Sequence, residues 1–534
     1  MLLRPMLAAG TAIALAAGPA AAFTLDILHF NDFHSRVEAI NGFDSTCSDE
    51  EAAAGECFGG AARLATAIDT AREAITGAGG NVLVLTAGDV FQGSLFFTTG
   101  RGQVEAELLN RIAADAMALG NHEFDLGPEP LAKFIETADF PVLTGNVDVS
   151  KDNMLAPLAE ERLLVEVGGE KVAILAATTP ETVEISTPGP SVSFADPVAY
   201  LTGAVRAVEA EGANKVILVS HLGVAADIRV AEAVPGIDLI VGAHDHIRFA
   251  NDGEAEYAYP LMVAGPDGRQ VPIVQAGAYS KYLGRITLEF DEAGIVTSAT
   301  GDTAVLDASV TPDPEVEARI EALAAPIEEL KARKVAEIAG DIDGSRESCR
   351  HGECAMGNLV ADAMLDRVKG QGVTIALQNG GGLRASIGAG EVSMGDVLAV
   401  LPFQNTLSTF NIDGAGIVAA LENGVSQVEE NGGRFPQVAG LRVTWDPAAP
   451  PNGGRIKAVE VEEDGAWVPI DPEKTYTVAT NNFMRNGGDG YAALRDRATN
   501  AYDYGPGLDD VLAAYLAEHP DYPTGLQGRI IAVK

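Results

Sequence analysis

Leu25-Asp26-Ile27-Leu28-His29-Phe30-Asn31-Asp32-Phe33-His34 is the stretch that decides the fold of this chain. Its first part, Leu25–Phe30, is an apolar run of the kind that forms a buried strand. Asp32 and His34 follow that run directly. Side chains just beyond the carboxyl end of a strand lie where layered α/β sheets usually hold ligands. The stretch therefore predicts an α/β domain with a ligand site beside its first strand.

The same arrangement recurs at four later places in the chain. The four further motifs are Gly88-Asp89-Val90-Phe91-Gln92-Gly93, Asn121-His122-Glu123-Phe124-Asp125, Ser220-His221-Leu222-Gly223 and Ala243-His244-Asp245-His246. With Asp32-Phe33-His34 as the first, the five motifs hold five of the only eight histidines in 534 residues. One such motif occurs often by chance, but five in order, each after an apolar run, indicate a metal site. The pattern predicts an enzyme rather than a generic globular domain.

The residue types in these motifs suit a pair of divalent ions. Two ions held close together need a bridging ligand, and the Asp89 carboxylate is suited to bridge because it has two oxygens and a charge. Asp32 and His34 lie two residues apart on an extended segment, so both can turn toward one ion. Neutral imidazole and amide oxygen complete each shell. The predicted ligands are Asp32, His34, Asp89, Asn121, His221, His244 and His246.

The chain is too long for one ordinary domain, and its pattern changes twice. Residues 23–310 alternate apolar runs with helical spacing and predict a layered α/β domain. Residues 311–336 predict a linker helix capped by Thr311 or Asp313, with an ordinary packed helix of either domain as the alternative. Residues 337–534 predict a second α/β domain with glycine-rich turns.

Individual elements of the first domain follow from the same pattern. The expected strands are Leu25–Phe30, Val82–Thr86, Val172–Ala176, Val216–Ser220 and Leu239–Val241. The expected helices are Gly60–Arg72, Gln103–Ala114 and Pro197–Glu211.

The first residues and the cysteines predict an exported protein, periplasmic or secreted. Met1–Ala22 has a positive start, an apolar stretch and a small-residue cleavage pattern, which is typical of a signal peptide. The alternative, a membrane anchor, would need a longer apolar core. Four cysteines in an exported chain favour disulfides, most simply Cys47–Cys57 and Cys349–Cys354. A structural zinc site is a poor alternative because the two cysteine pairs are far apart in sequence.

The charge of the chain restricts its partners. The formal net charge is −40, from 36 Lys and Arg against 76 Asp and Glu. Such a surface repels polymeric nucleic acid and anionic membranes. It would also repel a small anionic substrate unless metal ions and arginines make the site itself positive.

The histidine-containing motifs resemble those of calcineurin-like metallophosphoesterases, and more narrowly those of the 5′-nucleotidase family. The resemblance covers nearly the whole chain after the predicted signal peptide. It implies a four-layer α/β/β/α metallophosphoesterase domain, a linker helix and a second, α+β, substrate-binding domain. It also divides the ligands between two ions, with Zn expected and Mn or Co as alternatives. Asp32, His34, Asp89 and His246 would hold one ion, and Asp89, Asn121, His221 and His244 the other.

His122 and Asp125 are better explained as a catalytic pair than as ligands, and the resemblance implies the same roles. Asp125 can accept a hydrogen bond from one ring nitrogen, which orients the imidazole and supports its cationic form. The other nitrogen then donates to phosphoryl oxygens as charge develops. The alternative for His122 is a satisfied loop histidine. His29, His351 and His519 are expected to be structural or solvated.

The second domain offers groups that suit a nucleotide. Cys349–Cys354 encloses Arg350 in a tight loop, and a glycine turn ends at Arg384, so two guanidinium groups are available for phosphate oxygens. The resemblance implies that Arg350 and Arg384 bind phosphate and that Asn379 contacts the nucleoside. Phe435 and Phe483 would stack on the base, and Asp489 would accept hydrogen bonds from the ribose. Without the resemblance, both phenylalanines would be taken for core residues.

The expected reaction is hydrolysis of nucleoside 5′-monophosphates by in-line attack of a metal-bound water. One alternative is a UDP-sugar or dinucleotide pyrophosphatase, or a 2′,3′-cyclic nucleotide phosphodiesterase, on the same scaffold. An alternative of another class is a non-catalytic exported binding protein. Because the site draws on both domains, the linker helix is expected to permit a hinge motion.

Overall fold

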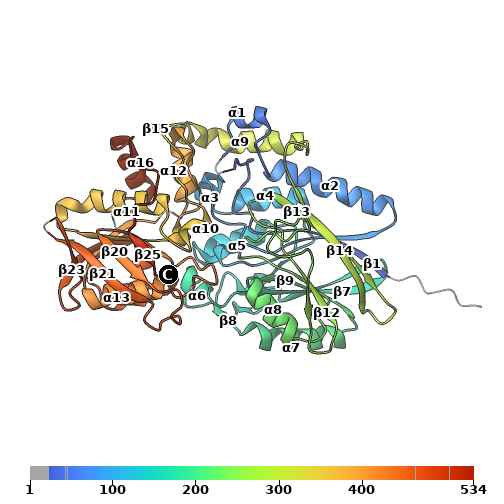
Figure 1. Ribbon diagram of the computed structural model, residues 1–534. Coiled ribbons are helices and arrows are strands. Elements are labelled where there is room, and N and C mark those ends of the chain that lie inside the picture. The colour runs from blue at the N-terminus through green and yellow to red at the C-terminus, as the bar shows by residue number, and fades with distance from the viewer. Residues whose placement is uncertain are drawn as a thin grey trace, which may run out of the picture.

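The computed structural model describes residues 23–533, apart from 43, 45, 404, 464 and 504. The signal peptide predicted for residues 1–22 lies outside the described residues. Figure 1 shows two α/β parts side by side, with helix α9 (Pro314–Lys331) running along the top between them. The first part is coloured from blue through green to yellow-green, and the second from yellow-orange to red.

Two six-stranded sheets form the centre of the first part. One has the strand order β14-β13-β1-β2-β3-β4, and the other β11-β12-β10-β9-β7-β6. The strands of the first sheet are β1 (Phe23–Phe30), β2 (Asn81–Thr86), β3 (Ala116–Ala118), β4 (Val142–Leu143), β13 (Tyr282–Phe290) and β14 (Val296–Val305). Those of the second are β6 (Arg162–Val167), β7 (Glu170–Thr178), β9 (Lys215–His221), β10 (Leu239–Val241), β11 (Leu261–Ala264) and β12 (Gln270–Val274).

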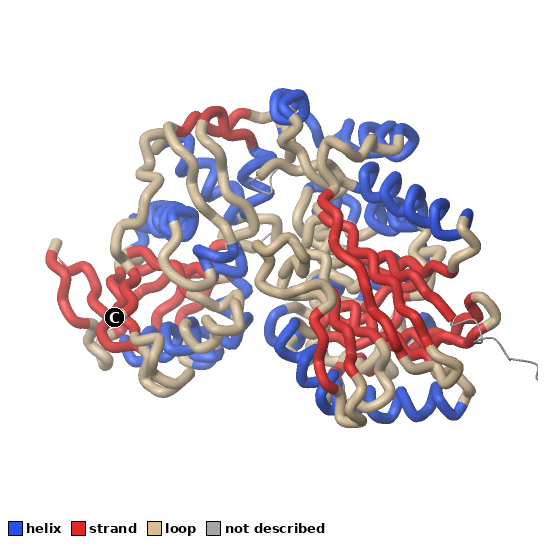
Figure 2. Tube along the Cα trace, turned by 45° about the vertical axis from the view of Figure 1, so that its right-hand side comes forward, coloured by secondary structure: helices blue, strands red, loops and turns tan. Residues whose placement is uncertain are grey.

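The alternation of side chains along β1 explains why the two sheets stack. Leu25 and Ile27 are fully buried among the residues of the second sheet. Leu28 and Phe30 point to the opposite face and pack against helices. The helices on that face are α2 (Ala61–Gly77), α4 (Gln103–Ile112) and α5 (Pro128–Thr137). Helices α7 (Pro197–Ala210) and α8 (Val224–Ala233) cover the second sheet, so the four-layer α/β/β/α prediction is confirmed (Figure 2).

The linker region is a helix, but it is shorter than predicted. Asp313 caps it, because Asp313 Oδ1 accepts hydrogen bonds from the backbone N–H groups of Glu315 and Val316. The helix packs on α2, α4 and α3 (Leu95–Gly100) of the first part and on α12 (Met394–Val400) of the second. It ends at Lys331, and Val335 already belongs to strand β15 (Lys334–Ile338).

The second part is a mixed α and β structure. A five-stranded sheet has the order β19-β16-β23-β18-β24, and a four-stranded sheet the order β22-β21-β20-β25. The strands of the first are β16 (Ile375–Asn379), β18 (Leu407–Asp413), β19 (Pro436–Ala439), β23 (Thr475–Asn481) and β24 (Thr499–Tyr502). Those of the second are β20 (Leu441–Trp445), β21 (Ile456–Glu463), β22 (Ala466–Pro469) and β25 (Ile530–Ala532). Helices α11 (Ala355–Val368) and α13 (Gly414–Gly424) pack against these sheets, and α16 (Leu508–Glu518) packs against α11 and β15.

Candidate functional site

The strand order brings the sequence-predicted ligands together. β1, β2 and β3 are parallel neighbours, so the loops that follow them leave the same edge of the first sheet. β9 and β10 are parallel neighbours in the second sheet, and β9 lies against β3. The motifs that begin near Asp32, Asp89 and Asn121 therefore meet those that contain His221 and His244.

Two groups of ligand atoms result, and Asp89 joins them. Asp32, His34 and His246 form one group, and Asp89, His221 and His244 the other, each with its ligand atoms within 4.8 Å of one another. Within the first group, His246 Nε2 lies 3.3 Å from Asp32 Oδ1 and 3.1 Å from His34 Nε2. Asp89 Oδ2 lies 3.1 Å from His221 Nε2 and 3.7 Å from His34 Nε2, so it faces both groups.

The amide side chain of Asn121 joins the second group. Its Oδ1 lies 3.0 Å from Nδ1 of His244. All seven predicted ligands therefore lie in one cluster.

The chemistry of this cluster fits divalent cations. Asp32 Oδ1 and His221 Nε2 are buried, and neither has a hydrogen-bond partner among the described residues. Buried polar atoms without partners are costly unless an unseen group satisfies them. Nitrogen and oxygen donors of this mixture bind transition-metal ions well. The cluster could hold two ions in the division that the sequence suggests.

Backbone contacts hold the ligand side chains in place. His34 Nδ1 lies 3.1 Å from the carbonyl oxygen of Phe91, and His221 Nδ1 lies 2.6 Å from that of Ala87. Such contacts fix the ring orientation and leave Nε2 of each ring facing the cluster. Asp32, His34, Asp89, His244 and His246 all have positive φ angles. Strain of this kind concentrates where function constrains the backbone.

Glu123 organises the loop that carries Asp89. The backbone N–H groups of Asp89, Val90 and Phe91 all donate to its carboxylate, at 3.0, 2.7 and 3.2 Å. Gly120 donates to the same carboxylate at 2.6 Å. The sequence singled out the histidine beside Glu123 and missed this role.

Burial keeps three of the histidines in the form that binds metal. It lowers the pKa values of His34, His244 and His246 well below their usual range. These rings are therefore neutral, with a free lone pair. Burial works to raise the pKa of Asp89, but the neighbouring His221, His122 and His34 together outweigh it and hold that pKa well below its usual range.

His122 and Asp125 form a close pair beside the cluster. His122 Nδ1 lies 2.6 Å from Asp125 Oδ2, while His122 Nε2 lies 4.0 Å from Asp89 Oδ2. Burial works to lower the pKa of His122, but Asp125 and Asp89 outweigh it and raise that pKa. The ring therefore carries a proton readily and faces the ligand cluster with Nε2.

A cavity of about 1730 Å³ connects this cluster to the second part of the chain. From the first part it is lined by Asp89, Asn121, His122, Asp125, His244 and His246. From the second part it is lined by Arg350, Asn379, Arg384, Phe483 and Asp489, all of which the sequence singled out. Asn379 Nδ2 donates to Asp489 Oδ2 at 2.6 Å, and Arg384 Nη2 lies 3.2 Å from His34 Nε2.

The prediction that Phe435 lines the substrate site is wrong. Its side chain is fully buried and packs against Trp445 in the core of the second part, with ring centroids 5.8 Å apart. It immediately precedes β19, where side chains point into that core. Phe403 takes the expected place: it lines the cavity, as Phe483 does. Phe403 follows helix α12 in an ordinary Leu-Pro-Phe sequence, so no glycine turn marked it.

Two further cavity residues gave no clear sequence signal. Arg346 is half-buried, lines the cavity and donates from Nη2 to the backbone oxygen of His244 at 3.1 Å. The ring of Tyr279 lies 5.1 Å from that of His246 and 5.6 Å from that of His34. Arg346 lies only four residues before Arg350, so a search around the cysteine loop would have found it.

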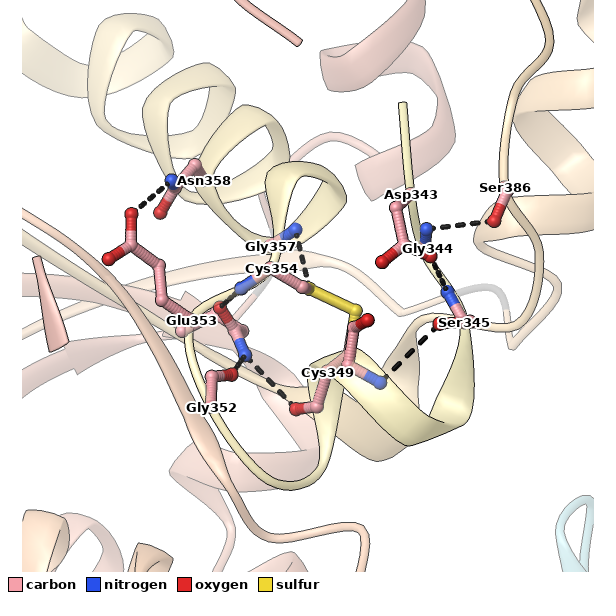
Figure 3. Close-up of a disulfide and its surroundings, with 12 residues drawn as sticks. Asp343, Gly344, Ser345, Cys349, Gly352, Glu353, Cys354, Gly357, Asn358 and Ser386 are labelled. Atoms are coloured by element: carbon pink, nitrogen blue, oxygen red, sulfur yellow. Dashed lines mark hydrogen bonds between the residues drawn. A yellow bond between two sulfur atoms is a disulfide. The ribbon is translucent and has the colours of Figure 1, made fainter. Parts of the chain in front are cut away.

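A disulfide closes the loop that holds Arg350. The structure joins Cys349 to Cys354, as drawn in Figure 3, and Cys47 to Cys57 elsewhere. Both sulfurs of the first bridge are buried, and Cys354 also caps helix α11 by accepting a hydrogen bond from Gly357. The bridge thus ties the Arg350 loop to the start of a long helix.

Comparisons with known proteins agree with this geometry. Residues 25–248 match the family model for calcineurin-like phosphoesterases, and residues 332–496 match that for the 5′-nucleotidase C-terminal domain. The human protein named 5′-nucleotidase is 35% identical over 98% of this chain and 93% of its own length. The chain belongs to the 5′-nucleotidase family.

Solved structures of 5′-nucleotidase relatives share the arrangement. A 5′-nucleotidase precursor from Thermus thermophilus is 39% identical, with a TM-score of 0.90 over 96% of this chain and 99% of that one. The NAD nucleotidase of Haemophilus influenzae is 27% identical, with a TM-score of 0.57 over 96% of this chain and 100% of that one. Among helices in the described part of the chain, none has the length and apolar character needed to cross a bilayer.

Proposed function

We propose that this member of the 5′-nucleotidase family is a metal-dependent phosphohydrolase that converts nucleoside 5′-monophosphates to nucleoside and phosphate. The observation that carries the proposal is the shared cavity. The metal-ligand cluster lies on one side of it and the arginine, asparagine and phenylalanine side chains on the other. A metal site facing both phosphate-binding and base-binding groups suits a nucleotide better than a simple phosphate ester.

Asp32, His34, Asp89, Asn121, His221, His244 and His246 would hold two divalent ions, with Zn favoured and Mn or Co as alternatives. When bound, such ions supply a Lewis acid for the phosphoryl oxygens and lower the pKa of the attacking water. The first effect would stabilise the negative charge on the phosphoryl oxygens, and the second would make the water a better nucleophile.

The side chains of this chain would orient the phosphoryl group and receive its charge. Arg350 and Arg384 can donate to phosphoryl oxygens, since both guanidinium groups line the cavity. His122 can donate from Nε2, because Asp125 holds Nδ1 and supports the cationic ring. These donors are fixed before substrate arrives, so little reorganisation is needed during the reaction.

The nucleoside would lie toward the second part of the chain. Phe403 and Phe483 offer ring faces for the base, and stacking of this kind contributes roughly 1–3 kcal/mol per base. Asp489, already paired with Asn379, can accept hydrogen bonds from ribose hydroxyls. These contacts would distinguish a nucleotide from a phosphate ester without a base.

The proposal extends to organisation and location. We take residues 23–310 as the metallophosphoesterase domain, 311–336 as the linker and 337–534 as the substrate-binding domain, with hinge motion at the linker. Export to the periplasm or the medium is supported by the two disulfides.

The test is chromatographic analysis of the products formed from a panel of AMP, ADP, UDP-glucose, NAD and 2′,3′-cyclic AMP, because cleavage of a pyrophosphate bond within UDP-glucose or NAD, or of a cyclic diester bond, frees no inorganic phosphate. The protein is first stripped with a chelator and then supplied with Zn, Mn or Co. Metal-dependent hydrolysis with the highest kcat/KM for AMP would support the proposal. A protein that cleaves no member of the panel with any metal would contradict the enzyme proposal and favour a binding protein.

A further inference from the structure

The carboxylate of Asp125 is held at both of its oxygens. Oδ2 lies 2.6 Å from His122 Nδ1, and Oδ1 accepts a hydrogen bond of 2.6 Å from the hydroxyl of Ser186. Ser186 is half-buried and lines the large cavity. A carboxylate held at one oxygen only can rotate about its side-chain bonds. The second contact removes that freedom and keeps Oδ2 directed at the imidazole.

Ser186 belongs to a short segment, residues 179–187, that is fixed at its other end to the metal-ligand cluster. The N–H of Thr179 donates to the backbone oxygen of His221 at 2.9 Å. Thr182 Oγ1 donates to the backbone oxygen of Thr179 at 2.7 Å, which starts the single turn α6 (Thr182–Ile185). The N–H of Ser186 then donates to the backbone oxygen of Thr182 at 3.0 Å. The position of Ser186 is therefore determined by the backbone of this segment.

The same segment meets the second part of the chain. α6 lies against the turn Gly488–Gly490, which contains Asp489. Gln427 Nε2 donates to Glu181 Oε1 at 3.4 Å, just before α6. A continuous set of contacts thus leads from the nucleoside side of the cavity to the hydroxyl that holds Asp125.

We propose that Ser186 is a positioning residue that couples the seating of the second part on α6 to the orientation of His122. Ser186 does not contact the phosphoryl group in this scheme, and it acts only through Asp125. When the Gly488–Gly490 turn packs on α6, it holds the hydroxyl of Ser186 in position. That hydroxyl in turn holds the carboxylate of Asp125 in its orientation toward His122. This inference rests on the proposed function, because it assigns Ser186 a role in the same reaction.

The first test is kinetic and uses Ser186→Ala. A hydrogen bond from a hydroxyl to a carboxylate is charge-assisted, so its loss should lower kcat for AMP roughly ten-fold. KM should stay within about two-fold, since no substrate contact is removed. Ser186→Thr keeps a hydroxyl and should restore kcat to within about two-fold of the natural protein. An unchanged kcat in Ser186→Ala would overturn the proposal.

A matched control lies five residues further on. Ser191 Oγ donates to Asp152 Oδ2 at 2.7 Å, a serine–aspartate hydrogen bond of the same kind, and neither residue is among those lining the large cavity. Ser191→Ala should leave kcat and KM unchanged. An equal fall in kcat in Ser191→Ala would assign the Ser186 effect to general loosening of this region.

A double-variant cycle tests whether Ser186 acts through Asp125. In an Asp125→Ala background, Ser186→Ala should change kcat by less than about two-fold, because the carboxylate it holds is gone. The full ten-fold effect in that background would show that Ser186 acts by another route, and the proposal would fall.

A measurement without turnover separates this inference from the proposed function. The downfield proton resonance of His122 Nδ1–H, identified by its loss in His122→Asn, reports directly on the bond to Asp125. It should shift or broaden in Ser186→Ala and remain in Ser186→Thr and Ser191→Ala. An unaltered resonance in Ser186→Ala would contradict the proposal, whether or not the natural protein hydrolyses AMP.

Discussion

The ring of Phe403 stacks on the imidazole of His122, with centroids 5.6 Å apart and planes inclined by 24°. The two residues come from opposite parts of the chain, so this contact exists only while the second part is seated over the metal-ligand cluster. The guanidinium of Arg384 lies over the ring of Phe403, with Cζ 5.5 Å from the centroid of that ring. Phe403 therefore connects the imidazole proposed to be catalytic with a guanidinium proposed to bind phosphate.

Replacing Phe403 by alanine should weaken nucleotide binding with little effect on folding. Loss of one stacking face costs roughly 1–3 kcal/mol, which raises KM for AMP about ten-fold. Hydrolysis of p-nitrophenyl phosphate, which has no base, should change far less. Steady-state kinetics on both substrates check this, and an equal change for both would refute a role in base binding.

Phe435→Ala is the informative counterpart, because the family resemblance favoured Phe435 as a base-binding residue. Its fully buried ring belongs to the core of the second part. Removing it should lower the free energy of unfolding by about 3–5 kcal/mol. Chemical denaturation measures that loss. KM for AMP in the remaining folded protein should be close to that of the natural protein.

His122→Asn should lower kcat by about 10²–10⁴-fold while leaving nucleotide affinity nearly unchanged. The reason is that the imidazole would donate a hydrogen bond to negative charge that develops only in the transition state. The dissociation constant for AMP can be measured by calorimetry on the inactive variant. His519→Asn, at an exposed position outside the cavity, is the control and should keep full activity. A large loss of affinity instead of kcat would assign His122 to binding.

Asp89→Asn should reduce the metal content of the protein more than a change at any other single ligand. Asp89 faces both ligand groups, so its loss removes a charge from each. Metal analysis after dialysis should find fewer than two ions per chain. Metal addition should raise the Tm of the natural protein by binding only the folded state, and the variant should show a smaller rise. Asp366→Asn, at a half-buried carboxylate beside Glu518 and His519 in the second part, should match the natural protein.

The metal centre was predictable from sequence because strand ends in a parallel sheet converge. The ligands His34, Asp89 and His221 each follow or end an apolar run, and strand order then fixes where they meet. Once the order of the strands is known, the meeting point of these side chains follows without further detail of how distant residues pack. The alternation of buried runs and amphipathic helices along the first part predicted a layered α/β domain. The resemblance to metallophosphoesterases was needed to predict four layers.

The substrate side was less predictable because a phenylalanine carries the same signal in a core and in a pocket. Phe435 lies beside glycines and an arginine, which resembles a binding loop, yet its ring packs into the core against Trp445. Phe403 lies beside leucine and proline, which resembles a core segment, yet it faces the cavity. Ser186 gave no signal at all, since its role depends on a contact 61 positions away in sequence.

Glu105 should make the protein less stable as the pH rises toward neutrality. Burial raises the pKa of this fully buried carboxyl to about 7, against the opposing hydrogen bond from Ser35 Oγ at 2.5 Å. The folded state therefore binds more protons than the unfolded state between the ordinary pKa of 4.5 and about 7. The contribution of the neutral carboxyl is complete below that window and is lost as the pH rises through it. The loss amounts to about 3 kcal/mol.

Glu105→Gln should remove this pH dependence, because the amide keeps an acceptor for Ser35 and carries no charge. Urea unfolding in the presence of a chelator, at pH 5 and at pH 8, measures the difference between the variant and the natural protein. The variant should be the more stable of the two at pH 8 and lose that advantage at pH 5. Glu107→Gln is the control, since Arg319 lowers the pKa of Glu107 and its charged form is the favoured one. An identical pH slope in Glu105→Gln and the natural protein would show that Glu105 is already ionised in the folded state.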